Sequence, residues 1–331
     1  MKKGTILSGM RPTGRLHIGH LVGALANWAS LQDEYNCFFM IADWHALMSE
    51  YANPQVVTDA TFDVAIDFMA CGLDPKRSTI FVQSDNPDHL ELDMVLSCVT
   101  PLGWLERCPT YKEQVQNLAD KDVSNYAFLG YPVLQAADIL IYKADTVPVG
   151  EDQLPHLELT REIARRVNNF YGPIFPEPQA KLTKAARFLG LDGRKMSKSY
   201  GNAINLTDTA EEIRAKVMTM FTDPQRQRRK DPGRPEVCNV YSYFEIFAPA
   251  ETSDVADKCR NALHGCTDCK ARMAEILDHA VAPIRLKRNE LATDTSRVEA
   301  ILAAGAARAR EVTAKTMAQV RKAIGLKVER R

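Results

Sequence analysis

The chain has 331 residues, of which 45% are hydrophobic and 25% charged, a composition typical of a folded globular protein and not of a disordered or fibrous one. No run approaches the roughly 18 consecutive apolar residues of a transmembrane helix, and the N-terminus lacks the apolar stretch of a signal peptide, so we expect a cytoplasmic protein without membrane attachment. The net charge is zero, but Asp and Glu outnumber Lys and Arg by 24 to 19 in residues 1–200 and are outnumbered by 18 to 23 in residues 201–331, so the C-terminal part is the one suited to face a polyanion.

Residues 1–200 are predicted to alternate strands and helices. The predicted strands are apolar runs at 5–8, 37–42, 78–83 and 146–149. The predicted helices begin near 17, 54, 88, 132 and 153, and a polar connector covers about 112–125. This alternation favours an α/β fold with a doubly wound parallel sheet, in which ligands bind at the carboxyl ends of the strands. Asp43 and His45 follow the second strand directly, and a structural histidine is the favoured interpretation there.

From about residue 205 the pattern becomes helical. Asp208 or Thr209, followed three residues later by Glu211 or Glu212, predicts a capping box at a helix start. Apolar residues then recur at helical spacing around 273–286 and from 298 to 324. We expect a domain boundary near residue 201.

The first chemical motif is Arg-Pro-Thr-Gly-Arg-Leu-His-Ile-Gly-His at residues 11–20, between the first predicted strand and helix. His17 and His20 are three residues apart, so they share one face at the start of the helix. Imidazole donors at the positive end of a helix dipole suit the polyphosphate of a nucleotide. Gly19 leaves a backbone position without a side chain, where a flat ring can lie close. Taken alone, the motif fits exposed histidines equally well.

The second motif is Lys-Met-Ser-Lys-Ser at residues 195–199, after Gly190 and Gly193. Its polar, glycine-rich setting predicts a mobile loop that carries the ammonium groups of Lys195 and Lys198. Taken alone, it would be a solvated basic loop.

Together the two motifs resemble the signature pair of class I aminoacyl-tRNA synthetases. The resemblance extends over essentially the whole chain and is greatest to bacterial tryptophanyl-tRNA synthetases, through residues 7–14, 43–45, 131–140 and 147–153. It implies a tryptophan–tRNA ligase, which activates L-tryptophan with Mg-ATP and transfers it from the adenylate to the terminal adenosine of tRNA-Trp. It also implies a Rossmann-like catalytic domain over 1–200, an all-helical anticodon-binding domain over 201–331, and a homodimer.

Adenylate formation needs groups that position ATP and stabilise the negative charge of the transferring phosphate. His17, His20, Lys195 and Lys198 are donors of that kind and are the predicted catalytic residues. The predicted ATP-binding residues are Arg11, Gly19, Met196, Gly150, Asp152 and Lys112. The resemblance places Gly19 and Met196 beside the adenine and Gly150 and Asp152 at the ribose, while for Lys112 a surface role is equally compatible.

Selection of the amino acid is expected to depend on one helix. Tyr131, Gln135 and Asp138 lie on one face of it, so a phenol, an amide and a carboxylate point the same way. The resemblance assigns Tyr131, Gln135 and Gln153 to the α-amino group of tryptophan and Asp138 to the indole N–H. Leu7, on the first strand, stands where tyrosyl enzymes carry a tyrosine, and an apolar residue there fits an indole better than a phenol.

Three other functions remain open. A tyrosyl-tRNA synthetase is disfavoured by Leu7. A nucleotidyltransferase that uses a His-x-Gly-His motif does not need the second motif. A catalytically inactive, synthetase-derived RNA-binding protein would not need intact histidines and lysines in both motifs.

Four cysteines, Cys238, Cys259, Cys266 and Cys269, gather in the C-terminal part. In the expected cytoplasmic setting a disulfide is disfavoured, which leaves a metal site or a group of buried free thiols. The spacing leaves zinc and an iron–sulfur cluster open. Resemblance to a subgroup of bacterial tryptophanyl-tRNA synthetases favours a [4Fe-4S] cluster, with zinc as the alternative.

Overall fold

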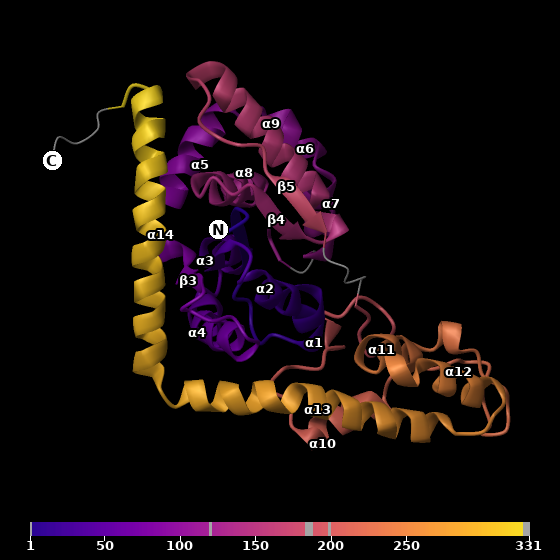
Figure 1. The fold of residues 1–331 in the computed structure, drawn as a ribbon. Helices are drawn as coiled ribbons and strands as arrows, with labels where there is room; N and C mark the ends of the chain where they lie inside the picture. Colours follow the sequence, from indigo (N-terminus) through magenta and orange to yellow (C-terminus); the bar gives the residue numbers. More distant parts are fainter. Residues whose placement is uncertain (1, 119–120, 183–187, 198–199, 327–331) are drawn as a thin grey trace. The chain divides into compact units, whose positions relative to one another are not determined.

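The computed structural model describes residues 2–118, 121–182, 188–197 and 200–326 (Figure 1). Contacts divide the chain into two compact units made of interleaved stretches. Unit 1 contains residues 1–14, 24–186 and 294–331, and unit 2 contains residues 15–23 and 187–293. In the described part of the chain, no helix has the length and apolar character needed to cross a membrane.

Unit 1 is built on a parallel sheet of five strands in the order β3-β2-β1-β4-β5. The strands are β1 (Thr5–Met10), β2 (Asn36–Ile41), β3 (Ser78–Val82), β4 (Thr146–Val149) and β5 (Gln179–Leu182). The predicted doubly wound fold and its four apolar strands are confirmed. The strand β5 was not predicted, because its segment Gln-Ala-Lys-Leu is partly exposed and is not an apolar run.

The α-helices of unit 1 are α2 (Ala26–Leu31), α3 (Asp43–Glu50), α4 (Gln55–Ala70), α5 (Asp88–Val99), α6 (Leu102–Arg107), α7 (Pro109–Asn117), α8 (Tyr126–Ile141), α9 (Leu154–Tyr171) and α14 (Thr295–Ala323). Two short 3-10 turns, η2 (Gln83–Asp85) and η3 (Glu151–Gln153), follow β3 and β4. Part of the expected polar connector is therefore the helix α7. The helix expected from about Pro132 begins at Tyr126, where Asn125 Oδ1 accepts the Phe128 N–H at 2.9 Å and caps it.

The core has two layers, one on each face of the sheet. On one face the Trp28 ring lies 5.2 Å from the Phe39 ring and 5.6 Å from the Phe68 ring, which joins α2 and α4 to β2. On the other face the Phe38 ring lies 4.5 Å from Tyr142, at the end of α8. Because both faces are covered, β2 is a continuous buried run from Cys37 to Ile41.

Helix α14 lies along β3 and α5, as Figure 1 shows, although more than two hundred residues separate them in sequence. β3 is an edge strand, so its outer backbone groups need cover. The contact is close at Gly305, where a Cβ would lie only 1.8 Å from the Ile80 carbonyl oxygen. Arg310 Nη1 also donates to the Asp85 carbonyl at 2.5 Å. The glycine thus lets the helix lie against the strand backbone.

Unit 2 is mainly helical. Its α-helices are α1 (Ile18–His20), α10 (Ala210–Met218), α11 (Asn239–Phe247), α12 (Thr252–Arg260) and α13 (Cys266–Ala292), with 3-10 turns η5 (Pro235–Val237) and η6 (Pro249–Glu251). A π-helical turn, η1 (Leu21–Leu25), follows α1. The predicted capping box is confirmed with Thr209 as the cap and Glu212 as its partner. Leu277 and Val281 of α13 are fully buried, which agrees with the predicted helical spacing.

Replacing Gly305 with alanine should destabilise the protein by about 1–3 kcal/mol, because the added methyl group overlaps the β3 backbone and α14 must shift. Gly130, inside α8, meets nothing within 4 Å of its added Cβ, so Gly130→Ala is the matched control and should be neutral or slightly stabilising. Urea denaturation of the three proteins measures this. Equal stability of Gly305→Ala and the wild type would contradict the close contact.

Candidate functional site

The first motif is divided between the units: residues 11–14 belong to unit 1, and residues 15–20 belong to unit 2, where they pair with residues 204–206. The Ile18 N–H donates to the Ile204 carbonyl at 2.9 Å, and the Leu206 N–H donates to the Leu16 carbonyl at 3.0 Å. The histidines of the first motif and the described residues 195–197 of the second therefore belong to one compact unit. The sequence analysis placed the first motif with the sheet that precedes it, because this pairing joins residues almost two hundred positions apart.

His17 and His20 lie together at the start of α1, as predicted. His17 is the N-cap residue, and its backbone N–H donates to His20 Nδ1 at 3.1 Å. The two ring centroids are 3.7 Å apart. A Cβ on Gly19 would lie 3.0 Å from the His17 ring and 3.4 Å from Met196 Sδ. Gly19 and the buried Met196, both expected at the adenine, are thus neighbours.

The second motif lies on a loop that Asn202 holds in place. The Asn202 side chain accepts the Ser197 N–H at 2.9 Å, and its Nδ2 donates to Asp192 at 2.7 Å and to the Lys195 carbonyl at 3.2 Å. A Cβ on Gly190 would lie 2.4 Å from the Asn202 amide, so this glycine makes room for it. Lys195 itself is exposed. Lys198 lies outside the described residues. Asn202 was not predicted to have this role, since an asparagine after a glycine predicts only a turn.

In unit 1, Asp138 is 2% exposed and accepts hydrogen bonds from three side chains. His45 Nε2 lies 2.9 Å from Oδ2, His89 Nδ1 lies 2.6 Å from Oδ1, and Gln83 Nε2 lies 2.8 and 3.0 Å from the two oxygens. Burial alone would raise the pKa of Asp138, but the hydrogen bonds from His45 and His89 outweigh it and hold the pKa below its ordinary value. The carboxylate is therefore ionised although it is buried.

These three partners come from different elements. Only His45 was singled out from the sequence, where a structural histidine was the favoured interpretation, and no role was predicted for Gln83 or His89. His45 lies at the start of α3, just past β2, and Gln83 directly follows β3. His89 is in α5 and completely buried, and its Nε2 lies 2.9 Å from the Tyr142 hydroxyl. The rule that ligands meet strand ends was the available signal for His45 and Gln83. Nothing local in the sequence pointed to His89.

Tyr131 shares α8 with Asp138, as predicted, and its hydroxyl lies 3.0 Å from His156 Nε2. Burial raises the pKa of the Tyr131 phenol above its ordinary value, so the hydroxyl keeps its proton at neutral pH. Gln135, on the same helix, is half-buried, as is Gln153, whose Nε2 donates to Asp152 at 3.2 Å. Leu7 is 3% exposed and belongs to the core.

The remaining predicted ATP-binding residues of unit 1 are spread over three elements. Arg11 follows β1 and is half-buried. Burial lowers its pKa, and the nearby Tyr131 and Glu50 act in the opposite direction. Gly150 follows β4, and a Cβ there would lie 2.6 Å from Asp152 Oδ1. Lys112 is exposed on α7, a position that fits the surface interpretation.

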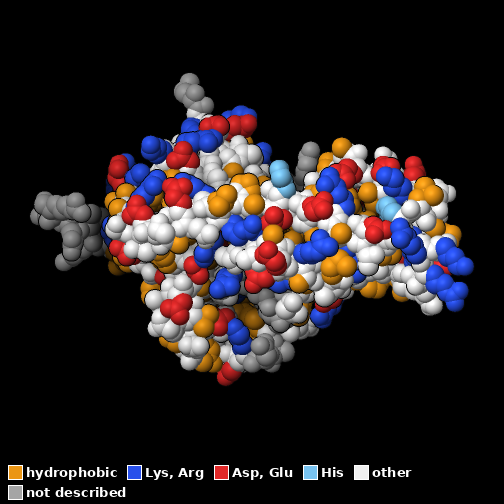
Figure 2. Space-filling model, turned by 90° about the horizontal axis from the view of Figure 1, so that it is seen from below, with side chains coloured by type: hydrophobic (Ala, Val, Ile, Leu, Met, Phe, Trp, Pro, Cys, Tyr) orange, Lys and Arg blue, Asp and Glu red, His pale blue; other side chains and the backbone are white. Residues whose placement is uncertain are grey.

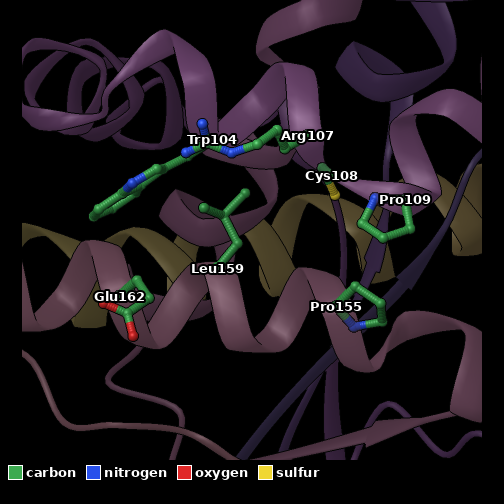
Figure 3. A pocket seen from close by; sticks show the side chains of 7 residues that line it. All are labelled: Trp104, Arg107, Cys108, Pro109, Pro155, Leu159 and Glu162. Carbon is green, nitrogen blue, oxygen red and sulfur yellow. The ribbon is translucent and has the colours of Figure 1, made fainter.

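A cavity of about 330 Å³ lies between α9 and the α6–α7 segment (Figure 3). Pro155, Leu159 and Glu162 line it from α9, and Trp104, Arg107, Cys108 and Pro109 line it from the other side. The Cys108 sulfur also lies 3.8 Å from His156 Nδ1. Cys108 therefore lines the cavity and also contacts His156.

The four C-terminal cysteines are free thiols from three places in unit 2: before α11, in α12, and at the start of α13. Burial, and then the charges of Cys238, Cys259 and Cys266, raise the pKa of Cys269 to about 12, so the side chains lie near one another. In the residues that the structure describes, however, no three His, Cys, Asp or Glu side chains are arranged to hold a metal ion.

Comparison with known proteins gives consistent matches along the chain. The family described as "tRNA synthetases class I (W and Y)" matches residues 1–282. The chain is 51% identical to a tryptophan–tRNA ligase of Thermotoga maritima, over 97% of this chain and 99% of that protein. It is 42% identical to the corresponding ligase of Ralstonia nicotianae, over 97% and 98%. A crystal structure of Campylobacter jejuni tryptophanyl-tRNA synthetase with ADP and tryptophan is 33% identical, with a TM-score of 0.87, covering 97% of this chain and all of that one.

The stability of unit 1 should depend on pH through His156. Burial, with a smaller effect of the charge of His45, lowers the pKa of His156 to about 4, while Asp152 acts in the opposite direction. The unfolded chain therefore binds a proton below about pH 6.5 that the folded protein takes up only near pH 4. The free energy of unfolding should fall by up to about 3 kcal/mol between these two values and not change from this cause above pH 6.5.

Urea denaturation at pH 7, 6, 5 and 4.5 measures this dependence. His156→Gln should lose that part of the slope, because glutamine does not titrate. The same slope in the variant and in the wild type would show that other groups cause the loss.

Proposed function

Because this chain belongs to the bacterial tryptophanyl-tRNA synthetases of class I, and is therefore a tryptophan–tRNA ligase, we propose the following division of roles among its residues. The groups that select the amino acid lie in unit 1, and those that act on the phosphates of ATP lie in unit 2. The reaction needs both sets, since the carboxylate of tryptophan must attack the α-phosphate of ATP.

The observation that carries the assignment of unit 1 is the buried, ionised Asp138. A buried, charged acceptor binds an N–H donor strongly. It disfavours binding of a ring that has no N–H donor, because the acceptor then stays without that hydrogen bond. Asp138 therefore selects the indole N–H, while the apolar Leu7 offers no partner for a phenol hydroxyl. Tyr131, Gln135 and Gln153 bind the α-amino group. Arg11, Gly150 and Asp152 contribute to the ATP site.

In unit 2, His17 and His20 are proposed to donate to the phosphates at the start of α1, where the helix dipole is positive. Lys195 and Lys198 neutralise the charge that develops as pyrophosphate leaves, with Mg²⁺ bound to the ATP. Gly19 and Met196 form a flat apolar surface for the adenine, which the close packing of these two residues supports. The Campylobacter jejuni relative was crystallised with ADP and tryptophan, the two kinds of ligand that these assignments require.

Residues 1–200 are proposed to form the catalytic domain and residues 201–331 the anticodon-binding domain, with α14 packed on unit 1. The loop after Asp223 exposes Arg228, Arg229, Lys230 and Arg234, and Figure 2 shows Lys and Arg side chains gathered at the end of unit 2 that carries α12. Such a basic surface suits the phosphates of tRNA. We place the reaction in the cytoplasm.

A homodimer is proposed from the family. Support comes from exposed apolar side chains on unit 1, where Leu102 is 62% and Phe170 is 56% exposed. The Arg166 guanidinium lies 5.8 Å from the Trp104 ring and 5.3 Å from the Phe170 ring, so Trp104, Arg166 and Phe170 form one continuous patch. Patches of this kind occur at subunit interfaces.

The four cysteines are proposed to hold a [4Fe-4S] cluster, with zinc as the alternative. Four thiols near one another supply the donors that such a cluster needs. Gly233 leaves space beside Cys259, since a Cβ there would lie 2.6 Å from the sulfur, and Arg226 Nη1 donates to that sulfur at 3.6 Å. When bound, the cluster would join the segments before α11, in α12 and in α13. It would stabilise the tRNA-binding domain and take no part in adenylate formation.

The activity is tested by ATP–pyrophosphate exchange, which should depend on tryptophan and not on tyrosine or phenylalanine. Asp138→Asn should reduce the preference for tryptophan by about 1–3 kcal/mol, because a charged acceptor is lost. Asp145→Asn is the matched control: Asp145 accepts the Thr5 N–H at 3.0 Å at the amino end of the sheet and should leave selectivity unchanged. A preference that survives in Asp138→Asn would refute the assignment of Asp138.

Lys195→Ala should slow adenylate formation by about a hundredfold or more while tryptophan binding changes little, because its contact strengthens as charge develops in the transition state. Single-turnover kinetics and equilibrium binding separate the two effects. Lys258→Ala, which removes an exposed lysine paired with Asp254 in the same unit, should have no effect on either. Equal losses in rate and in binding would show that Lys195 makes its contact already in the ground state, which contradicts the proposed role.

Purification without oxygen should give about four irons and four sulfides per chain, with broad visible absorption, if the cluster forms. Cys266→Ser should lower the iron content and impair tRNA charging, yet leave pyrophosphate exchange nearly intact. Cys98→Ser, at an exposed cysteine of unit 1, is the control. Stoichiometric zinc without sulfide would establish the alternative, and absence of both metals would reject the site.

A further inference from the structure

We infer that His156 is a positioning residue: its Nε2 accepts a hydrogen bond from the Tyr131 hydroxyl, so that the phenol oxygen accepts from the α-ammonium group of tryptophan. The inference rests on the role proposed above for Tyr131. It adds a residue that does not touch the substrate and that sets the direction of a hydrogen bond at the amino-acid site.

The Tyr131 hydroxyl and the His156 imidazole lie within hydrogen-bond distance. The Tyr131 hydroxyl lies 3.0 Å from His156 Nε2, and the two rings meet edge to face with centroids 5.2 Å apart. His156 is 2% exposed, and Thr160 Oγ1 donates to its carbonyl at 2.9 Å within α9. Both side chains start from helices of the same unit, so their relative position is set by packing.

The chemistry of the substrate decides which of the two groups donates. An ammonium group has only donors to offer, so a hydroxyl that binds it must accept and must send its own proton elsewhere. A neutral imidazole with the proton on Nδ1 has a bare Nε2 that accepts this proton. The same site therefore needs a histidine that is neutral and in one particular tautomer.

The surroundings of His156 favour the neutral form. The ring is buried, and the positive charge that His45 carries when protonated opposes a second positive charge on His156, while Asp152 favours one and is outweighed. Arg11 is positive and lies near Tyr131, the hydrogen-bond partner of His156. On the other side of the ring, Nδ1 faces the Cys108 sulfur at 3.8 Å, a weak acceptor for the remaining N–H. Figure 3 shows Cys108 at the border of the cavity beside α9.

The test compares two ligands that differ only in the amino group: L-tryptophan and indole-3-propionic acid, which keeps the ring and the carboxylate. The dissociation constant of indole-3-propionic acid divided by that of L-tryptophan measures what the amino group contributes to binding. His156→Asn should reduce this ratio about ten- to a hundredfold, because the shorter amide does not reach Tyr131 and a hydrogen bond to a charged group is weakened. His156→Gln places an acceptor at the position of Nε2 and should restore most of the ratio.

Two further variants make the result specific. Tyr131→Phe should reduce the ratio as His156→Asn does, and the double variant should show no additional loss, since both changes remove the same contact. His89→Leu removes an equally buried histidine that contacts Asp138, so it should weaken both ligands and leave the ratio unchanged. Binding of ATP reports that each variant is folded.

The results distinguish the role of His156 from the role proposed for Tyr131. If Tyr131→Phe leaves the ratio unchanged, the proposed role of Tyr131 is wrong. If Tyr131→Phe lowers the ratio and His156→Asn does not, the role of Tyr131 stands and the inference about His156 is overturned. A His156→Asn variant that weakens both ligands equally, without rescue by His156→Gln, shows a purely structural residue and also overturns it.

Discussion

The buried carboxylate of Asp138 imposes a requirement that the surrounding structure meets with three donors. A charge that is 2% exposed would cost several kcal/mol if it were unpaired. His45 brings a donor from the end of β2, Gln83 from the end of β3, and His89 from α5. One side chain of α8 thereby fixes two strand ends and a neighbouring helix, and the hydrogen bonds that make the charge tolerable also hold it in one orientation.

The hydrogen bonds of Asp138 belong to a network that continues to α14. His89 meets the Tyr142 hydroxyl at 2.9 Å, Asn86 donates to that hydroxyl at 3.3 Å, and Asn86 donates to Thr313 of α14 at 3.1 Å. Polar groups buried this deeply need partners, so α14 satisfies the interior as well as covering β3. This explains why a helix at the far end of the sequence belongs to unit 1.

Burial has opposite consequences for the two ionisable groups, Asp138 and His156, at the proposed amino-acid site. Asp138 stays charged because its donors outweigh the cost of burial, and an ionised acceptor suits an indole N–H. His156 stays neutral because burial is not compensated, and a neutral imidazole can accept the Tyr131 proton. The difference lies in the number of partners, since both side chains are almost completely enclosed.

The sequence by itself determined the features that depend on neighbouring residues: the buried parallel strands, the capping box at Thr209, the two signature motifs, and the helix that carries Tyr131 and Asp138. Only the tertiary structure decided which side chains complete the site. His156 lies 25 positions from Tyr131, and Gln83 lies 55 from Asp138. The pairing of Ile18 with Ile204 likewise placed the histidines of the first motif in the second unit. Local periodicity reports which face of an element is apolar, but a partner is chosen by packing between distant elements, and no spacing in the chain records that choice.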